Sequence, residues 1–256
     1  MEELKEKIAA ADYILIGVGE EWEDPVNQEI MKQHIDPWLK KCREEESLRF
    51  MVPYLLKASL HKENEESRQR AYHNLKELVA GKDYFVITTC INHELYEQGF
   101  FDQTIVAPCG SYRKLQCGKG CTKQLFPVPD LLPEKIDKVI KGMADVEILN
   151  EMKCPECGSP LTYNNINADY YVEDGYLLQW EVYKKWLQKT VNRKICIVEL
   201  GVGMAYPTVI RWPFEKVACI NEQASLIRVH EQLYQIPEEI KDKSTSIKSN
   251  SIDFLK

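Results

Sequence analysis

Short apolar runs alternate with stretches of helical spacing along most of this chain. Four of these runs predict buried strands, because an uninterrupted apolar run of this length fits a strand that is covered on both faces. They lie within residues 11–22, 84–88, 194–200 and 216–222. A glycine turn follows the first run, and another follows the third.

Helical patterns fill most of the segments between the strands. Residues 1–10 predict an amphipathic helix, and residues 24–80 are mostly helical in pattern, with interruptions at Pro37 and Pro53. A further helix is predicted over residues 175–191, with apolar residues on or near one face. These apolar residues are Leu178, Val182, Trp186 and Leu187. Strands that alternate with helices predict an α/β fold with a parallel sheet and right-handed crossovers.

Three other segments carry weaker patterns. A charged surface helix is expected from Glu63 to Glu77, ending at Gly81. Residues 105–163 have no strong period, and they hold two pairs of cysteines. The polar tail from Lys241 is expected to fray.

Composition narrows the class of protein. A chain of 256 residues suits one sizeable core with a small appended module. The formal net charge is −7 and the basic residues are scattered, which argues against nucleic acid and anionic membranes as partners. No apolar run reaches the ~20 residues of a membrane helix, and the opening MEELKEKIAA has no apolar signal core. Nine cysteines without a secretion signal indicate metal binding or free thiols, so a cytoplasmic location is expected.

The two cysteine pairs carry the strongest chemical signal. Cys117 and Cys121 lie in QCGKGCTK, and Cys154 and Cys157 lie in KCPECGSPL. Two such pairs can complete the tetrahedral shell of Zn²⁺, whereas a redox pair needs no second pair. We therefore predict a structural zinc with four protein ligands and no open position for a substrate. Unrelated free thiols are the alternative.

Two Gly-x-Gly sequences stand at predicted strand ends. Gly17 and Gly19 follow the first strand, and Gly201 and Gly203 follow the third. A glycine-rich turn at the carboxyl end of a parallel strand lets the backbone approach a phosphate or ribose closely. We therefore expect these four glycines to bind a nucleotide, with ordinary strand-to-helix turns as the alternative.

Small polar side chains follow two other predicted strands. Thr88, Thr89 and Cys90 stand at the end of the second strand, and Asn221 and Glu222 at the end of the fourth. In an open parallel sheet the carboxyl edge lines the ligand crevice. An asparagine there can hydrogen-bond ribose hydroxyls or an adenine edge. The competing interpretation is that these residues cap helices.

Several of these segments resemble the sirtuin family. FVITTCINHELYEQGF, beginning at Phe85, is similar to the sirtuin segment that reads TTN-I-D followed by a helix and Ala-Gly. The cysteine pairs follow it in the sirtuin order. GVGMAYPTVIRWPF, beginning at Gly201, and VEDGYLLQWEVYKKWL, beginning at Val172, resemble the branch of sirtuins associated with macrodomains. The resemblance extends over about residues 10–240.

The resemblance implies a fold and a chemistry. It implies a Rossmann-like parallel sheet with helices on both faces, formed by residues 1–104 and 165–256, and a small zinc-binding module at 105–164. Sirtuins hold NAD between these parts and cleave its nicotinamide–ribose bond. The family transfers ADP-ribose to an acetyl oxygen or, in the macrodomain-linked branch, to a protein side chain. NAD or ADP-ribose, a structural zinc and a protein acceptor from a macrodomain-linked system are therefore the expected ligands and partner.

The chain also departs from the family pattern. Cys90 replaces the asparagine of TTN-I-D, and Asn92 replaces its aspartate. The catalytic histidine of the deacetylases aligns with Cys109. The usual arginine of the first loop is absent, and Glu20 and Glu21 stand beside the turn instead. Acidic groups there would repel a pyrophosphate unless they point away from it.

These observations favour one function and leave two alternatives open. The favoured function is NAD-dependent ADP-ribosyl transfer or NAD cleavage, with Asn92 and Cys109 in the catalytic positions, rather than lysine deacetylation. The first alternative is a module that binds NAD or ADP-ribose without turning it over. The second is a partner-binding protein whose cleft has lost the nucleotide. Calorimetric titration with NAD and ADP-ribose, followed by a nicotinamide-release assay on the same sample, separates the three.

Overall fold

The computed structural model describes residues 1–60 and 65–256. By their contacts they form two compact units, each described separately below. Of the described residues, the first unit contains 1–23, 65–109 and 176–256, and the second contains 24–60 and 110–175. The sequence analysis placed residues 24–60 with the Rossmann-like part, whereas here they pack with the segment that holds the paired cysteines.

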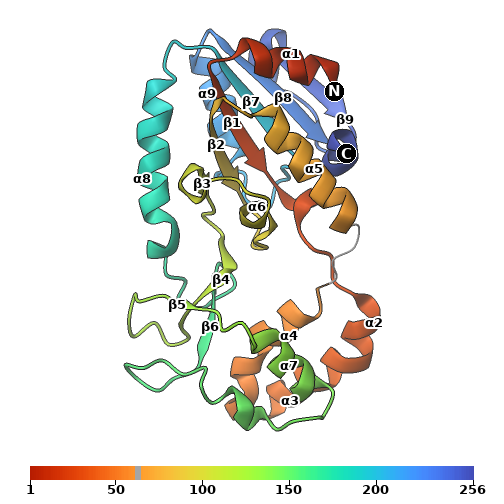
Figure 1. Cartoon of the computed structure of the whole chain (residues 1–256), viewed down its shortest axis with the longest axis vertical. Helices are drawn as coiled ribbons and strands as arrows, with labels where there is room; N and C mark the ends of the chain where they lie inside the picture. Colours follow the sequence, from red (N-terminus) through yellow and green to blue (C-terminus); the bar gives the residue numbers. More distant parts are fainter. Residues whose placement is uncertain (61–64) are drawn as a thin grey trace. The chain divides into compact units, whose positions relative to one another are not determined.

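A six-stranded parallel sheet organises the first unit (Figure 1). The strand order is β3-β2-β1-β7-β8-β9, so the direction of winding reverses between β1 and β7. This is the strand order of doubly wound, Rossmann-type sheets. The strands are β1 (Tyr13–Val18), β2 (Asp83–Thr88), β3 (Ile105–Val106), β7 (Ile195–Leu200), β8 (Ala224–His230) and β9 (Ser244–Lys248).

Helices cover both faces of this sheet, which is why its central strands are mostly apolar. Ile14 and Ile16 of β1 point to one face, and Leu15 points to the other. Residues of α1 (Glu2–Ala10), α5 (Glu65–Leu78) and α10 (Ser251–Leu255) pack on the first face. Residues of α8 (Asp174–Lys189) and α9 (Arg211–Ile220) pack on the second. The predicted helix from Glu63 matches α5 from Glu65 onward, and its first two residues lie outside the described part of the chain.

Three sequence predictions about this unit were wrong. The run 216–222 is not a strand, because α9 continues to Ile220 and the strand begins at Ala224. A short apolar run fits a buried helix as well as a strand, and here Phe214 and Ala218 bury one helical face. The tail from Lys241 does not fray but supplies β9 and α10, whose Leu255 is buried.

The third correction concerns the buried face of α8. Leu178 and Val182 are 71% and 43% exposed. Of the predicted residues, Trp186 is buried and Leu187 is partly buried against the core. Tyr183, which was not predicted, is buried as well, and the rings of Tyr183 and Trp186 both pack against Phe85 of β2. The aromatic residues of the helix therefore define its inner face, although Leu178 and Val182 have the correct spacing.

The second unit combines helices with a small antiparallel sheet in the order β5-β4-β6. Pro37 and Pro53 lie in the first turns of helices, where the missing N–H is tolerated, and so do not break the helical pattern. The ring of Tyr54 packs against Tyr163 with centroids 5.2 Å apart, which joins helix to sheet. The strands are β4 (Gly110–Cys117), β5 (Phe126–Pro127) and β6 (Leu161–Asn165), and the α-helices are α2 (Gln28–Ile30), α3 (Asp36–Glu44), α4 (Val52–Ala58) and α7 (Leu132–Ile140).

Short helical turns complete the two units. In the first unit, α6 (Glu94–Glu97) follows β2, and a 3₁₀ turn at Glu20–Trp22 follows β1. In the second, a π-helical turn at Met31–Ile35 joins α2 to α3, and a 3₁₀ turn at Glu46–Met51 precedes α4. Within the described parts of the chain, none of the helices combines the length and apolar character needed to cross a bilayer.

Candidate nucleotide edge and metal centre

The reversal of strand order brings the two glycine turns together. Val18 and Leu200 are paired at the carboxyl ends of β1 and β7. Beyond them, Gly19 N–H donates to the carbonyl of Leu200 at 2.9 Å, and Glu21 N–H donates to the carbonyl of Gly201 at 3.3 Å. Ligands of doubly wound sheets bind at this switch point. The fold therefore places both sequence-predicted turns at the position where a nucleotide is expected.

Two of the four glycines have clear packing roles. Gly17 lies inside β1, and a Cβ there would be 2.5 Å from Ile210 Cγ2, so it allows the segment before α9 to approach the sheet. A Cβ on Gly19 would be 2.4 Å from the Cα of Val202. Contact between the two turns is therefore enough to require glycine at position 19.

The other two glycines face acidic residues. Gly201 has φ +62°, and a Cβ there would lie 2.5 Å from the Cβ of Glu21. A Cβ on Gly203 would lie 2.8 Å from the Oε2 atom of Glu20. Gly203 is thus the position where the backbone lies directly against a charged group.

The residues after β2 extend the same edge. Thr89 N–H donates to the carbonyl of Val18, and Cys90 N–H donates to Thr88 Oγ1 at 3.0 Å. Cys90 Sγ lies 3.1 Å from the carbonyl oxygen of Gly19. Thr89 is 7% exposed, and its Oγ1 has no hydrogen-bond partner among residues 1–60 and 65–256. A buried hydroxyl without a partner is costly, so this atom is a candidate ligand contact.

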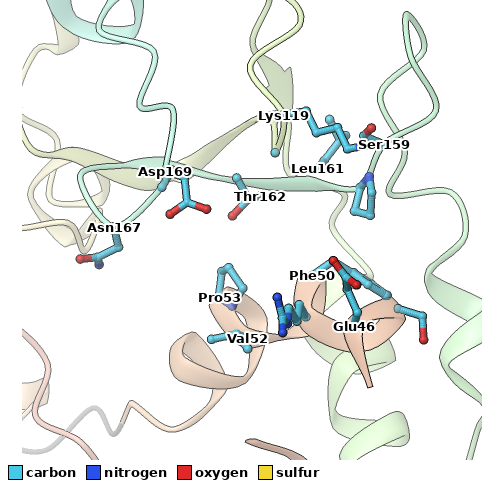
Figure 2. Close-up of a pocket in the computed structure, with 15 residues that line it drawn as sticks. Glu46, Phe50, Val52, Pro53, Lys119, Ser159, Leu161, Thr162, Asn167 and Asp169 are labelled. Carbon is cyan, nitrogen blue, oxygen red and sulfur yellow. The ribbon is translucent and has the colours of Figure 1, made fainter. Parts of the chain in front are cut away.

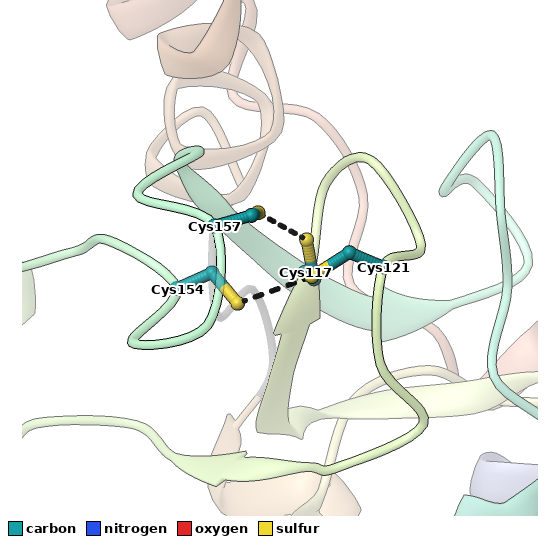
Figure 3. A group of neighbouring side chains, drawn as sticks. All are labelled: Cys117, Cys121, Cys154 and Cys157. Atoms are coloured by element: carbon teal, nitrogen blue, oxygen red, sulfur yellow. Dashed lines mark hydrogen bonds between the residues drawn. The ribbon is translucent and has the colours of Figure 1, made fainter.

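The four paired cysteines meet in the second unit, as their spacing predicts (Figure 3). Their Sγ atoms all lie within 4.8 Å of one another. The Cys117–Cys157 and Cys121–Cys154 sulfur pairs are each 3.6 Å apart. Sulfurs at the Zn–S bond length of a tetrahedral site are separated by about 3.8 Å. The four side chains therefore fit a structural zinc with a complete protein shell.

No protein-family model matches this chain. A curated protein ADP-ribosyltransferase from Staphylococcus aureus (strain Mu50 / ATCC 700699) is 30% identical over 180 residues, covering 68% of this chain and 56% of the relative. A probable bifunctional ADP-ribose hydrolase/ADP-ribosyltransferase from Fusarium oxysporum f. sp. cubense is 30% identical over 157 residues, covering 58% of this chain and 26% of the relative. The chain thus spans about half the length of the first relative and a quarter of the second.

Solved structures settle the fold. Sir2 in complex with the inhibitor EX-527, 2'-O-acetyl-ADP-ribose and a deacetylated p53 peptide matches with a TM-score of 0.56 and 14% identity, covering 100% of this chain and 96% of that one. A Sir2 homolog–NAD complex matches with a TM-score of 0.51 and 15% identity, covering 100% and 91%. The chain has a sirtuin fold. The predicted α/β architecture is thereby confirmed, and the fold is the one that the resemblance to the sirtuin family implies.

Within this sirtuin fold, Asn92 is held in place through its backbone and its amide. Its N–H donates to Glu23 Oε1 at 2.9 Å, and its Nδ2 donates to the carbonyl of Trp22 at 2.7 Å. The residue is 5% exposed, and in the described part of the chain its Oδ1 accepts no hydrogen bond. Asn92 therefore contributes a second buried acceptor that a ligand could satisfy.

Cys109 is buried in surroundings that suppress its ionisation. Burial, together with the negative charges of Glu20 and Glu23, raises the pKa of its thiol to about 12. The thiol is therefore protonated at neutral pH, and a protonated thiol cannot act as a general base. Cys90 is likewise buried, and burial raises its pKa well above the ordinary value.

Three carboxylates of the sirtuin-fold edge bind backbone amides, a role that the sequence did not reveal. Glu20 accepts from the N–H groups of Gly203 and Ala205. Glu21 accepts from Glu231 N–H and from both the N–H and the hydroxyl of Ser251. The third is Glu23, which accepts from the N–H groups that follow Cys90. Each carboxylate fastens the loop after β1 to a different loop of the same edge.

Asn221 and Glu222 lie away from this edge. Asn221 caps the C-terminus of α9, and its Nδ2 donates to the carbonyls of Thr190 and Arg193. Both residues precede β8, which begins at Ala224, so they stand at the amino end of the sheet. The strand that would have carried them to the carboxyl edge does not exist.

A cavity of about 710 Å³ opens in the second unit (Figure 2). Phe50 and Pro53 line one side, and Leu161 and Thr162 of β6 line the other. Lys119, beside the cysteine cluster, also lines it. Its lining mixes apolar residues with polar and charged ones, which include Glu46, Arg49 and Asp169. No sequence pattern indicated it, because its walls come from three separate segments.

Proposed function

We propose that this chain is an NAD-dependent ADP-ribosyltransferase with a sirtuin fold, rather than a lysine deacetylase. The observation that carries the proposal is the 30% identity, over 180 residues, with the protein ADP-ribosyltransferase of Staphylococcus aureus. A second relative is named for ADP-ribosyl transfer as well. A sirtuin-fold structure in complex with NAD supports NAD as the donor substrate.

The carboxyl edge of the first unit supplies the groups for this substrate. The N–H groups of the Gly203 loop suit a phosphate, since backbone amides at a glycine turn bind anions. Thr89 Oγ1 and Asn92 Oδ1 are buried and lack partners within residues 1–60 and 65–256, so polar groups of NAD would satisfy them. Cleavage of the nicotinamide–ribose bond builds positive charge on the ribose. The carbonyl dipole of Asn92 is suited to face that charge or to accept from the nicotinamide carboxamide.

The state of Cys109 opposes deacetylation. Deacetylation needs a base to activate a ribose hydroxyl, and Cys109 aligns with that base in the sirtuin pattern. With a pKa of about 12, the thiolate fraction at pH 7 is about one in 10⁵. Cleavage of NAD by electrostatic stabilisation does not need this proton transfer. The site therefore suits glycosidic cleavage better than deacetylation.

A nucleotide-binding module without turnover is the second candidate. The observation that favours it is the Glu20 carboxylate, which binds the amides of the Gly203 loop that a phosphate would use.

The acceptor of the ADP-ribose is proposed to be a protein side chain of a macrodomain-linked system, and the location is proposed to be cytoplasmic. The fungal relative, whose name combines ADP-ribose hydrolysis and transfer, supports a hydrolase as partner.

Nicotinamide release from labelled NAD tests the proposal directly. We expect slow release by the wild-type chain, transfer of labelled ADP-ribose to protein, and no deacetylation of an acetyl-lysine peptide. Asn92→Ala should reduce release by about 10²–10³-fold if Asn92 stabilises the transition state. Asn150→Ala, at an exposed position of the second unit, is the matched control. Robust deacetylation contradicts the proposal, whereas binding of ADP-ribose without release would favour the binding module.

A further inference from the structure

The Gly203 loop has the features of an anion site. Its N–H groups at Gly203 and Ala205 converge on one carboxylate, with N···O distances of 2.5 Å to Glu20 Oε2 and 3.3 Å to Glu20 Oε1. A Cβ on Gly203 would lie 2.8 Å from the same oxygen, so the end of the Glu20 side chain lies directly against the backbone. The loop therefore holds a group with two oxygens directly against its backbone.

A buried guanidinium supports the same loop. Arg211 is 7% exposed, and its Nη2 donates to the carbonyl of Val202 at 2.8 Å, next to Gly203. Its positive charge interacts favourably with Glu20. Arg211 Nε has no hydrogen-bond partner within the described segments. A positive charge with a spare donor beside paired amides makes the surroundings favourable for an anion.

We propose that the Glu20 carboxylate occupies the phosphate position of the nucleotide site and is displaced when the nucleotide binds. This inference rests on the proposed function, because the displacing group is a phosphate of NAD or ADP-ribose. Two anions cannot share one pair of N–H groups, so binding requires the Glu20 side chain to leave. Glu20 is thus an internal competitor that lowers the apparent affinity of the chain for its own substrate.

The neighbouring carboxylates behave differently. Glu21 is bound to Glu231 and Ser251, away from the Gly203 amides. Glu23 holds the N–H groups of Ile91 and Asn92. Glu21 therefore anchors the loop after β1 without occupying the phosphate position, which makes it the matched control for a change of charge at Glu20.

Calorimetric titration of the full chain with ADP-ribose tests the inference. Removing the competitor should tighten binding, because the apparent Kd falls as the competent fraction rises. We expect Glu20→Ala to lower the Kd by about 10–100-fold and Glu20→Gln to lower it by less, since an amide oxygen can still accept one N–H. Glu21→Gln should leave the Kd within about threefold of wild type, because its carboxylate does not touch these amides. Thermal unfolding of each variant shows that it is folded.

Amide hydrogen exchange gives a second readout that does not depend on activity. The Gly203 and Ala205 amides should exchange slowly in the wild type and faster in Glu20→Ala. When ADP-ribose is added to Glu20→Ala, they should exchange slowly again. If wild type binds and Glu20→Ala binds equally or more weakly, or if ADP-ribose leaves these amides unprotected, the inference is overturned and the proposed function stands. If neither protein binds ADP-ribose at millimolar concentration, the proposed function fails as well. Glu20→Gln replaces the alanine variant in both measurements if that variant does not fold.

Discussion

The cysteine cluster and the carboxyl edge of the six-stranded sheet are assembled in different ways. In the cluster, each pair of ligands comes from one tight turn, and two short segments supply all four sulfurs. At the edge, the groups around Gly203 come from separate loops, and Glu20 and Gly203 are 183 positions apart in the chain. The first arrangement is encoded by local spacing, whereas the second depends on how distant loops meet after folding.

This difference separates what each region can tolerate. The cluster has no substitute for a missing ligand, because a zinc shell needs all of its donors. At the edge, carboxylates of the chain itself bind the backbone amides of the loops. A change in the cluster should therefore act on folding, and a change at the edge should act mainly on binding.

Loss of the metal is the largest expected effect. Cys154→Ser should abolish stoichiometric zinc and lower the thermal midpoint strongly, because structural zinc binding contributes about 10–16 kcal/mol to folding. Elemental analysis and calorimetry of protein made without chelator measure both quantities. Cys219→Ser changes an exposed cysteine outside the cluster and is the control. A wild-type chain without stoichiometric zinc would contradict the assignment of all four ligands.

Breaking the buried ion pair beneath the edge is the next largest effect. Arg228 donates to Glu199 at 2.5 Å and to Glu215 at 2.7 Å, and its side chain is 1% exposed. Arg228→Ala should cost about 3–5 kcal/mol in the free energy of unfolding, because it leaves a buried carboxylate unpaired. Lys241→Ala removes an exposed pair with Glu238 and should cost about 0–1 kcal/mol. Urea unfolding compares the two variants. If Arg228→Ala loses as little unfolding free energy as Lys241→Ala, the buried ion pair does not stabilise the sheet beneath the edge.

Much of the fold could be predicted, because burial on both faces makes the central strands mostly apolar. Residues 13–18 and 195–200 show this clearly, although Glu199 in the second of them is a buried charge. The last predicted strand failed because an apolar run at the end of α9 has no distinguishing period. The helix α7 was missed although Leu132, Ile136 and Val139 have helical spacing and are buried together.

The candidate site could be predicted only in part. The cysteines and Gly203 could be named from the sequence, because paired cysteines and Gly-x-Gly sequences are short local patterns that indicate metal and nucleotide binding. The amide contacts of Glu20 were not, since nothing in the sequence shows which loop a carboxylate will meet. Asn221 was misplaced because its predicted position at the edge required residues 216–222 to form a strand, whereas most of them belong to α9.

A smaller effect is expected where the two glycine turns touch. Gly201→Ala should cost about 1–3 kcal/mol, because the backbone has φ +62° and the new Cβ would lie 2.5 Å from Glu21 Cβ. Gly142 has φ +68° with nothing within 4 Å, so Gly142→Ala measures the cost of the backbone conformation alone. The difference in unfolding free energy isolates the steric contact. Equal costs in the two variants would show that the turns do not pack as closely as the structure places them. Any loss of nucleotide binding in Gly201→Ala must be corrected for its loss of stability.

The smallest effect is expected at Cys109, where the sequence pattern suggested a catalytic base. Because its pKa is raised to about 12, the thiol stays neutral from pH 6 to pH 9 and gains thiolate only as the pH approaches 12. Cys109→Ser should therefore change nicotinamide release far less than the ~10²–10⁴-fold loss that follows removal of a general base. Alkylation of Cys109 in the wild type should accelerate about tenfold per pH unit throughout this range. Two results together would restore this thiol as the base: a plateau in the alkylation rate below pH 9, and a large loss of nicotinamide release in Cys109→Ser. The edge would then act by proton transfer rather than by the placement of charge.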